Sequence, residues 1–225
     1  MPPRAYFDRL LGELRDDILS MGSLVAAELV LSLEALDELS LTLAKEVRTA
    51  DRVVNKARFD IEEKCFTLIV TQQPAARDLR TVVTAMNIIV DLERMGDQAK
   101  GIAKVIPHIL KNPDQAQPKA LQAMGTMVGK MLNQVMIAYA HGNVDMARLV
   151  ARQDDEVDAL YAQVFTEIMG KMAETDTADN VEAAYEMLRV ARELERFGDL
   201  ATNIAERTVY LVTGSFEEVN IEDEL

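Results

Sequence analysis

The sequence predicts an all-α fold made of two tandem antiparallel three-helix bundles, and three observations lead to this prediction. The 225-residue chain is rich in Ala, Leu, Glu, Arg and Met, which are strong helix formers. It contains no Trp and only 5% aromatic residues, a composition unfavourable for a β-rich fold. The segment DLERMGDQAKGIA, which begins at Asp91, returns as ELERFGDLATNIA from Glu193 with eight of thirteen positions identical.

The repeat extends over most of the chain. MGSLVAAELVLSLEAL from Met21 matches MGTMVGKMLNQVMIAY from Met124 at a separation of 103 residues. VRTADRVVN and VARQDDEVD match at the same separation, and the opening motif recurs after 102 residues. Similar segments in the same order at a nearly constant separation indicate a tandem duplication. Each unit of about 100 residues has the size of an ordinary domain.

Proline and turn residues divide each half into three helices. QQPAARDLR, AHGNVD and AETDTADN contain the residues that favour turns, and a proline cluster marks a linker at 111–118. The first bundle is therefore expected at 1–110 and the second at 119–225, and Asp78 is expected to cap the third helix. The predicted helices span 5–40, 46–72, 76–106, 119–141, 145–173 and 178–212.

Charge and hydropathy exclude several classes of protein. The net charge is -14 and the pI is near 4.6, so phosphate backbones and anionic lipid surfaces repel the chain. We expect no nucleic-acid partner and no direct membrane insertion, since no apolar run approaches the roughly 18 to 20 residues of a membrane span. The N-terminus lacks the apolar region of a signal peptide, and the single Cys65 excludes an internal disulfide. A cytoplasmic protein is expected, and the acidity could serve solubility alone.

The repeated segment carries acids on one helix face. Glu93 and Asp97 are four residues apart and therefore share a face. In the second copy the corresponding face lies within an arc of about 80° and is formed by Glu195, Asp199, Asn203 and Glu206. The first copy has Gly101 and Lys104 where the second has the last two of these residues, so its site is expected to be thinner.

The neighbouring helices supply further oxygen ligands. Asp51 and Asn55 are four apart, as are Asp154 and Asp158. If these helices pack antiparallel to the repeated segments, two short carboxylate ladders face one another. Such ligands suit hard cations, and the ion is left open among iron, manganese, magnesium, zinc and calcium. With only two histidines in the chain, a His-rich zinc site and the Glu-x-x-His pattern of ferritin-like bundles are excluded.

An alternative is that these acids are simply solvated beyond the packed part of the helix. Like charges four residues apart cost a few tenths of a kcal/mol, and keeping that cost in both copies favours a bound cation. Gly96 and Gly198, directly before each motif Asp, suggest close approach of a ligand or of another helix. The acids continue a stripe that is expected to be packed in the first part of the helix, formed by Leu79, Val82, Val83, Met86 and Val90.

The remaining charges of the motif are expected to be structural. Arg94 follows the motif Glu and is expected to pair with Asp91, as Arg196 is with Glu193. No phosphate-binding Gly-rich loop, HExxH motif or nucleophile elbow is present. The chain is therefore predicted not to be an enzyme, although carboxylates alone could support metal-assisted hydrolysis beside a suitable pocket.

The doubled motif, together with QQPAARDLR before its first copy, resembles the PhoU family over residues 5–213. The resemblance implies tandem three-helix bundles whose E/DxxxD motifs bind metal clusters. It also implies a cytoplasmic negative regulator of phosphate uptake, often a homodimer, that associates with the phosphate ABC transporter and a phosphate-sensing histidine kinase. The family motif maps onto Glu93, Asp97, Glu195 and Asp199.

The sequence departs from the family pattern in its second half. TDTADNVE stands where QPAARDLR would be expected, and Lys104 against Glu206 makes the two sites unequal. A rival interpretation is a metal-independent helical adaptor, which would use its acidic faces to bind basic surfaces of a partner. This adaptor would ignore chelators and lose its partner at high salt.

Overall fold

A computed structural model describes residues 3–111, 117–174 and 178–215, and these residues form helices and no strands. The all-α prediction is confirmed. Most of the predicted linker, and the acidic tail from residue 216, lie outside the described residues. The helices are α1 (Pro3–Asp37), α2 (Leu41–Gln72), α3 (Arg77–Ile109), α4 (Lys119–His141), α5 (Val144–Arg152), α6 (Asp154–Ala173) and α7 (Ala178–Thr213).

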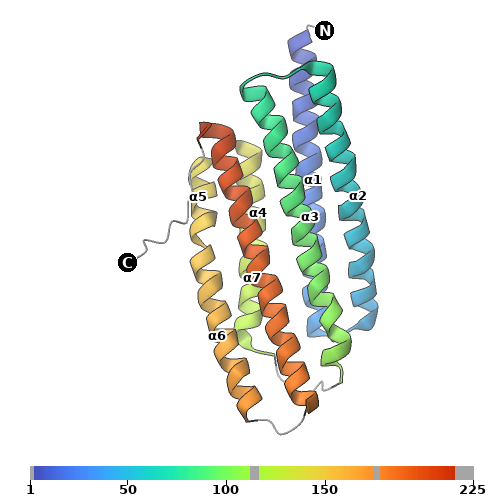
Figure 1. The fold of residues 1–225 in the computed structure, drawn as a ribbon, viewed down its shortest axis with the longest axis vertical. Helices are drawn as coiled ribbons and strands as arrows, with labels where there is room; N and C mark the ends of the chain where they lie inside the picture. Colours follow the sequence, from blue (N-terminus) through green and yellow to red (C-terminus); the bar gives the residue numbers. More distant parts are fainter. Residues whose placement is uncertain (1–2, 112–116, 175–177, 216–225) are drawn as a thin grey trace.

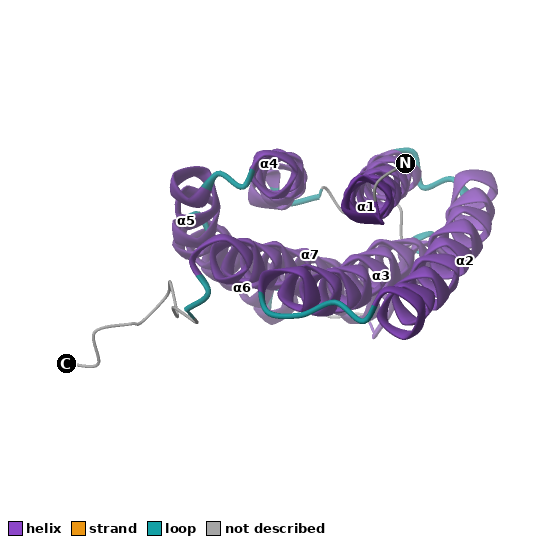
Figure 2. Ribbon diagram, turned by 90° about the horizontal axis from the view of Figure 1, so that it is seen from above, coloured by secondary structure: helices purple, strands orange, loops and turns teal. Residues whose placement is uncertain are grey.

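The helices form two bundles that meet along α3 and α7. α1, α2 and α3 make the first bundle, and α4 to α7 make the second (Figure 1). α3 and α7 run antiparallel at the centre, and their contact is the most extensive between any two described elements. Seen from above, α2, α3, α7 and α6 follow one curved row, and α1 and α4 lie on its inner side (Figure 2). The repeated helices therefore form the joint between the two halves.

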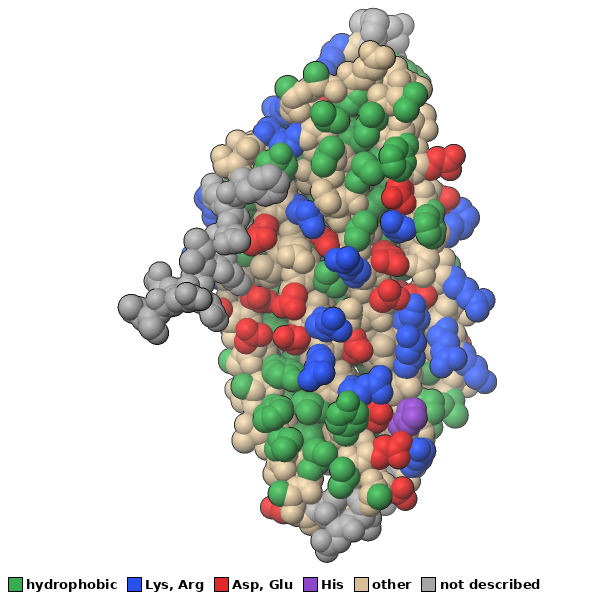
Figure 3. Space-filling model, viewed as in Figure 1, with side chains coloured by type: hydrophobic (Ala, Val, Ile, Leu, Met, Phe, Trp, Pro, Cys, Tyr) green, Lys and Arg blue, Asp and Glu red, His purple; other side chains and the backbone are tan. Residues whose placement is uncertain are grey.

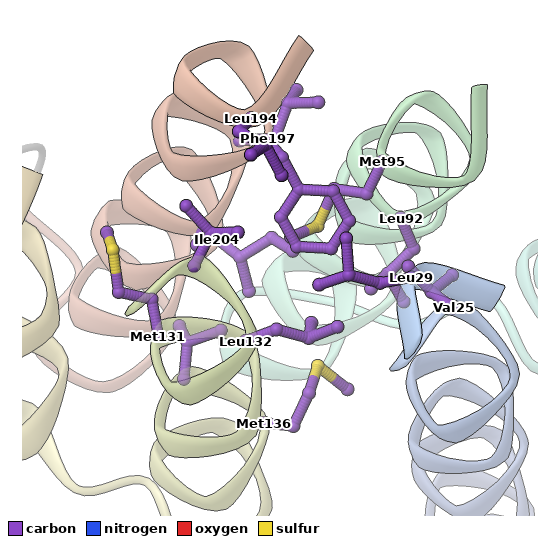
Figure 4. Packing of buried hydrophobic residues seen from close by; sticks show 14 of the residues in the cluster. Val25, Leu29, Leu92, Met95, Met131, Leu132, Met136, Leu194, Phe197 and Ile204 are labelled. Carbon is purple, nitrogen blue, oxygen red and sulfur yellow. The ribbon is translucent and has the colours of Figure 1, made fainter. Parts of the chain in front are cut away.

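The hydrophobic core continues from one bundle into the other. Buried side chains from α1 and α3 pack against buried side chains from α4 and α7 (Figure 4). Apolar residues recur every three to four positions along each helix, so one stripe of the helix faces this core. Because the apolar cluster is continuous, the two bundles share one core in the folded chain. The labelled members are Val25, Leu29, Leu92, Met95, Met131, Leu132, Met136, Leu194, Phe197 and Ile204.

The first turn of the chain comes earlier than the sequence predicts. α1 ends at Asp37, and Leu39 has a φ of 48°, in the left-handed region. Ser40 caps α2, because its side chain accepts a hydrogen bond from Leu43 N at 3.3 Å. The predicted start of the second helix at residue 46 is therefore wrong by five residues, because the Ser40 cap lets the helix begin at Leu41.

The expected cap of the third helix is also wrong. Ala76 occupies the N-cap position and makes no side-chain capping hydrogen bond. Asp78 lies in the first turn and pairs with Arg4, whose Nη1 is 2.6 Å from Asp78 Oδ2. At the other end, α3 continues through Pro107 to Ile109, beyond the predicted end at residue 106.

The predicted helix at 145–173 is interrupted. α5 ends at Arg152, and Gln153 separates it from α6. The first turn of α6 contains Asp154, Asp155 and Glu156. Three acids in a first turn stabilise a new helix N-terminus through the helix dipole, which explains why a helix begins here. One of these acids is a predicted metal ligand.

The prediction that no segment approaches the length and hydropathy of a membrane span is wrong for α1. Arg4–Asp37 contains an 18-residue window of mean hydropathy 1.6, so this helix could cross a membrane by length and composition alone. In the folded chain 44% of that window is buried. Its core face includes Ile18, Met21 and Val25, each fully buried against the other helices. Burial in a protein core accounts for an apolar helix of this kind.

Candidate functional site

Acidic side chains gather at mid-height on the face formed by α2, α3, α7 and α6 (Figure 3). The first cluster, on α1 to α3, contains Glu28, Asp51, Glu93, Asp97 and Lys100. The second cluster, on α6 and α7, contains Asp154, Asp158, Glu195 and Asp199. Apolar side chains cover the two ends of this face, and basic side chains lie among the acids (Figure 3).

In the first cluster a lysine joins two helices. Lys100 Nζ donates a hydrogen bond to Asp51 Oδ1 at 2.8 Å and another to Asp97 Oδ1 at 2.5 Å. Burial alone would lower the pKa of Lys100, but these hydrogen bonds and charges raise it. Asn55 Nδ2 donates to Asp51 Oδ2 at 3.2 Å. The predicted approach of α2 acids to α3 acids is therefore present, with an ammonium between them.

Glu28 adds a buried carboxyl group to the first cluster. The side chain is 0% exposed, and neither of its oxygens has a hydrogen-bond partner. Burial, followed by repulsion from Asp51, raises its pKa to about 8 despite the opposing charge of Lys100. Burial and the charge of Asp97 also raise the pKa of Glu93. The interior end of this cluster therefore has an oxygen pair that no side chain satisfies.

The second cluster contains four acids that repel one another. Burial, together with the charges of Asp199 and Asp158, raises the pKa of Asp154 to about 6. Burial also raises the pKa of Asp199 to about 6, with contributions from Glu195 and Asp158. Burial and Asp158 raise the pKa of Glu195. Arg196 opposes these shifts at Glu195 and Asp199 without cancelling them.

A shallow surface hollow of about 500 Å³ opens on the second cluster. Its lining is mostly polar, contains two arginines as well as two acids, and comes from α6 and α7. A cation could therefore reach these acids from solvent. The lining residues are Tyr161, Arg192, Glu195, Arg196 and Asp199.

Two predicted ligands lie farther along α7. Asn203 and Glu206 are half-buried, and Glu206 makes an interaction of its own. The charges that raise the pKa of Asp199 are those of Glu195 and Asp158, and Glu206 is not among them. The interacting acids of α7 in the second cluster are therefore Glu195 and Asp199, at the start of the predicted acidic face.

Helix packing is tight at Gly96 and ordinary at Gly198. A Cβ atom at Gly96 would lie 3.1 Å from Glu28 Oε2 and 3.4 Å from Val54 Cγ1. At Gly198 a Cβ atom would make ordinary contacts, the nearest with Val157 at 3.5 Å. Of the two suggested causes, close approach of another helix is the one the structure contains, and it is tight only in the first copy.

The stripe that leads into the acids is packed only in part. Val82 is fully buried and Met86 packs against the core, whereas Leu79 and Val83 are 39% and 41% exposed. The prediction that this line is packed is therefore wrong for Leu79 and Val83.

One of the two predicted arginine pairings differs in the structure. Asp91 is 1% exposed, and its Oδ2 accepts a hydrogen bond from Arg207 Nε at 2.6 Å. Arg207 comes from the other bundle, and the expected partner Arg94 acts on Asp91 through its charge.

The predicted partner of Glu193 does act on it: burial raises the pKa of Glu193, and the charge of Arg196 opposes that rise. Glu193 also lies against Gly101, where a Cβ atom would be 2.7 Å from Glu193 Cδ. Asp91 and Glu193 therefore both face the joint between the bundles.

Glu28 and Lys100 were not predicted from the sequence. Glu28 could have been found, since a lone acid lies on the apolar stripe of Met21, Val25 and Leu29, and buried acids are rare. Lys100 could have been found because it follows Asp97 by three residues and so shares its face.

The side chains of the two clusters offer oxygen donors but no preformed coordination shell. Within the described ranges, no three His, Cys, Asp or Glu side chains converge in an arrangement that could hold a metal ion. The second cluster nevertheless fits a cation by the chemistry of its donors, because its four carboxylates repel one another. Cation binding or contact with a basic partner would relieve this repulsion.

The fold and these clusters define a class of protein, an all-α double bundle with acidic clusters on one face. The chain belongs to the PhoU family, whose domain model matches residues 18–106 and again 121–208. It is 35% identical over 218 residues to a phosphate-specific transport system accessory protein PhoU homolog from Clostridium acetobutylicum, covering 96% of this chain and 99% of that protein. A homolog of the same description from Zymomonas mobilis is 38% identical and covers 92% and 87%.

Solved structures give the same result. The chain is similar to the crystal structure of the phosphate transport system regulatory protein PhoU from Streptococcus pneumoniae, with a TM-score of 0.87, 32% identity and coverage of 94% and 99%. It is also similar to PhoU from Pseudomonas aeruginosa, with a TM-score of 0.85, 32% identity and coverage of 93% and 100%. The resemblance noted in the sequence is confirmed, and the family is one of regulatory accessory proteins, not of enzymes.

Proposed function

We propose that this protein is an accessory regulator of a phosphate-specific transport system and that it acts in the cytoplasm as a negative regulator. The observation that carries the proposal is the match to transport-system accessory proteins over nearly the full length of both chains. The repeated motif that forms the joint and the clusters lies within both matched domains. The proposal therefore concerns the whole double bundle.

The second cluster is the part of the molecule that we propose to bind a metal ion. Asp154, Asp158, Glu195 and Asp199 would hold it, with Asn203 and Glu206 farther along α7. Iron, manganese, magnesium, zinc and calcium all stay candidates, with hard cations favoured by carboxylate ligands. A bound cation would supply positive charge on an acidic face, which could attract a phosphate group or an acidic partner surface. The corresponding residues of the first cluster are Asp51, Asn55, Glu93 and Asp97.

The partners proposed are the phosphate ABC transporter and a phosphate-sensing histidine kinase. The apolar ends of the face in Figure 3 support a protein partner, because exposed apolar patches mark interaction surfaces. Exposed apolar side chains on the helices of this face include Phe66 and Val70 of α2, Phe165 and Met169 of α6, and Tyr185 of α7. A homodimer is also proposed, and light scattering on the full chain would measure it.

The test is a strain that lacks this chain and carries a reporter for phosphate-starvation genes. We expect the reporter to be active in phosphate-rich medium, and the wild-type gene to repress it. Asp154→Asn/Asp199→Asn should fail to repress at equal protein level. As a matched control, Asp8→Asn changes an exposed acid whose partner is Arg4 on α1, and it should repress normally. Unchanged reporter activity and unchanged phosphate uptake in the deletion strain would contradict the proposed role.

The metal-independent adaptor is the second candidate. It is favoured by the absence of a preformed coordination set among the described residues. In this case transporter binding would persist in a chelator and weaken steeply between low and high salt. The adaptor would be excluded if a chelator abolished transporter binding and if manganese or iron restored it.

A further inference from the structure

The two clusters share three equivalent acids and differ at three positions, one of which is Asn55 in the first cluster and Asp158 in the second. Counting along the repeat, Asp51, Glu93 and Asp97 correspond to Asp154, Glu195 and Asp199. Lys100 corresponds to Thr202, and Glu28 corresponds to Met131. The first cluster therefore contains a lysine and a buried glutamate that the second cluster lacks. The backbone around the two clusters also differs, because Asp51 lies inside α2 whereas Asp154 lies in the first turn of α6.

Lys100 occupies the position in the first cluster where a bridging cation would be useful. Its Nζ contacts Asp51 Oδ1 on α2 at 2.8 Å and Asp97 Oδ1 on α3 at 2.5 Å. The side chain is 19% exposed and that of Asp51 is 8% exposed, so water screens this contact poorly. An ammonium that neutralises two acids on two helices does electrostatically what a bound metal ion would do.

The second cluster has a neutral residue where the first has this ammonium. Thr202 is 7% exposed, and Arg196 lowers the pKa of Glu195 and Asp199 only in part. The acids that correspond to the Lys100 partners repel one another there. The lysine ammonium therefore lies between the acids of the two helices in the first cluster, whereas the equivalent position of the second cluster has a hydroxyl group and Arg192 and Arg196 lie beside the acids in the surface hollow. An external cation could take the equivalent position in the second cluster.

We propose that Lys100 is the resident cation of the first cluster, so that a metal ion binds only to the second cluster. The part about the second cluster rests on the function proposed above, whereas the part about Lys100 stands on the first cluster alone. Replacing Lys100 with the Thr of the second copy would leave Asp51, Asp97 and the unpartnered Glu28 as oxygen donors around the vacated volume. The first cluster should then accept a metal ion.

The test uses the full chain, purified without an affinity tag, stripped with chelator and equilibrated with Mn²⁺. Bound manganese is measured by elemental mass spectrometry, and the melting temperature is measured with and without Mn²⁺. The wild type should bind manganese. The variant Asp154→Asn/Asp199→Asn should bind none, and Asp51→Asn/Asp97→Asn should bind as much as the wild type. Lys100→Thr should bind about one additional equivalent and melt lower than wild type without Mn²⁺, with recovery on its addition. Thr202→Lys should bind no manganese, because its ammonium would take the place of the metal ion in the second cluster.

Each other outcome overturns a distinct claim. If wild-type manganese falls in Asp51→Asn/Asp97→Asn, the first cluster binds metal and Lys100 is not its resident cation. If folded Lys100→Thr gains no manganese and no Mn²⁺-dependent rise in melting temperature, the inference is also overturned. If the wild type binds none but Lys100→Thr does, the proposed metal function fails while the role of Lys100 stands. Should Lys100→Thr not fold, Lys100→Gln and the Thr202→Lys result decide the question.

Discussion

Asp91 Oδ2 and Arg207 Nε are joined by a hydrogen bond of 2.6 Å across the joint between the two bundles. Asp91 lies on α3 at 1% exposure, and Arg207 lies on α7 with its side chain 32% exposed. Burial raises the pKa of Asp91, and the hydrogen bond and charge of Arg207 oppose that rise. The carboxylate is therefore compatible with its buried position because of a residue 116 positions away in sequence.

Loss of Arg207 is expected to destabilise the whole double bundle. Arg207→Ala leaves Asp91 buried without its partner, which should lower the free energy of unfolding by about 3 kcal/mol. Chemical denaturation measures the change. Asp91→Ala/Arg207→Ala should cost less than the sum of the single variants.

An exposed ion pair across the same joint is the matched control for this prediction. Lys111 Nζ lies 2.8 Å from Glu182 Oε1, with side chains 50% and 36% exposed. Lys111→Ala should cost under about 1 kcal/mol, because exposed pairs contribute little. Equal costs for Lys111→Ala and Arg207→Ala would show that burial at the joint does not strengthen the Asp91 pair.

Two glycine substitutions are expected to act in opposite directions. Gly142 ends α4 with a φ of 61°, and a Cβ atom there would lie 3.3 Å from Val212. Gly142→Ala should therefore lower the melting temperature, at a cost of about 1 kcal/mol. Gly170 lies inside α6, where an added methyl group would point into open space, so Gly170→Ala should stabilise by about 0.5–1 kcal/mol. If both substitutions changed the free energy of unfolding in the same direction, this explanation of the two glycines would be wrong.

Cys65 is expected to be inert in the native protein. It is 0% exposed, and burial raises the pKa of its thiol from 9.0 to about 11. Two pKa units reduce the thiolate fraction about a hundredfold at pH 8, so alkylation should be slower than in urea by at least that factor. Mass spectrometry of iodoacetamide-treated samples measures both rates.

The same shift has a consequence for stability at high pH. Below about pH 9 the thiol is protonated in both the folded and the unfolded chain, so it makes no difference to the free energy of unfolding. Between about pH 9 and 11 only the unfolded chain releases the proton, so stability should fall as pH rises. A stability curve for wild type that declines no more steeply than that of Cys65→Ala would contradict the raised pKa.

Ser40 is expected to determine where the second helix begins. Its side chain accepts from Leu43 N at 3.3 Å, and Ser40→Ala should cost about 1 kcal/mol. Ser23, which is exposed within α1 and donates to Leu19 O, offers a control, because Ser23→Ala should be neutral or slightly stabilising. Denaturation of both variants measures the difference, and equal effects would exclude a capping role.

The sequence predicted the fold well because its evidence was local and repeated. Helix-forming composition, turn residues and the doubled motif led to the correct class and to α4 within its observed limits. It predicted the acids of both clusters, except Glu28, from their spacing. It failed where a neighbour decides the outcome: the exposed Leu79 and Val83 lie on a line that the pattern assigned to the core.

By itself the sequence determined that the chain is helical, duplicated and acidic along one face of each repeated helix. Helical spacing and composition are properties of neighbouring residues, so they can be read without the fold. Only the tertiary structure decided that Arg207 pairs with Asp91 and that Lys100 lies between Asp51 and Asp97. These relationships depend on the packing of α2, α3 and α7, which brings distant residues into one low-dielectric space where a single charge determines what each cluster can bind.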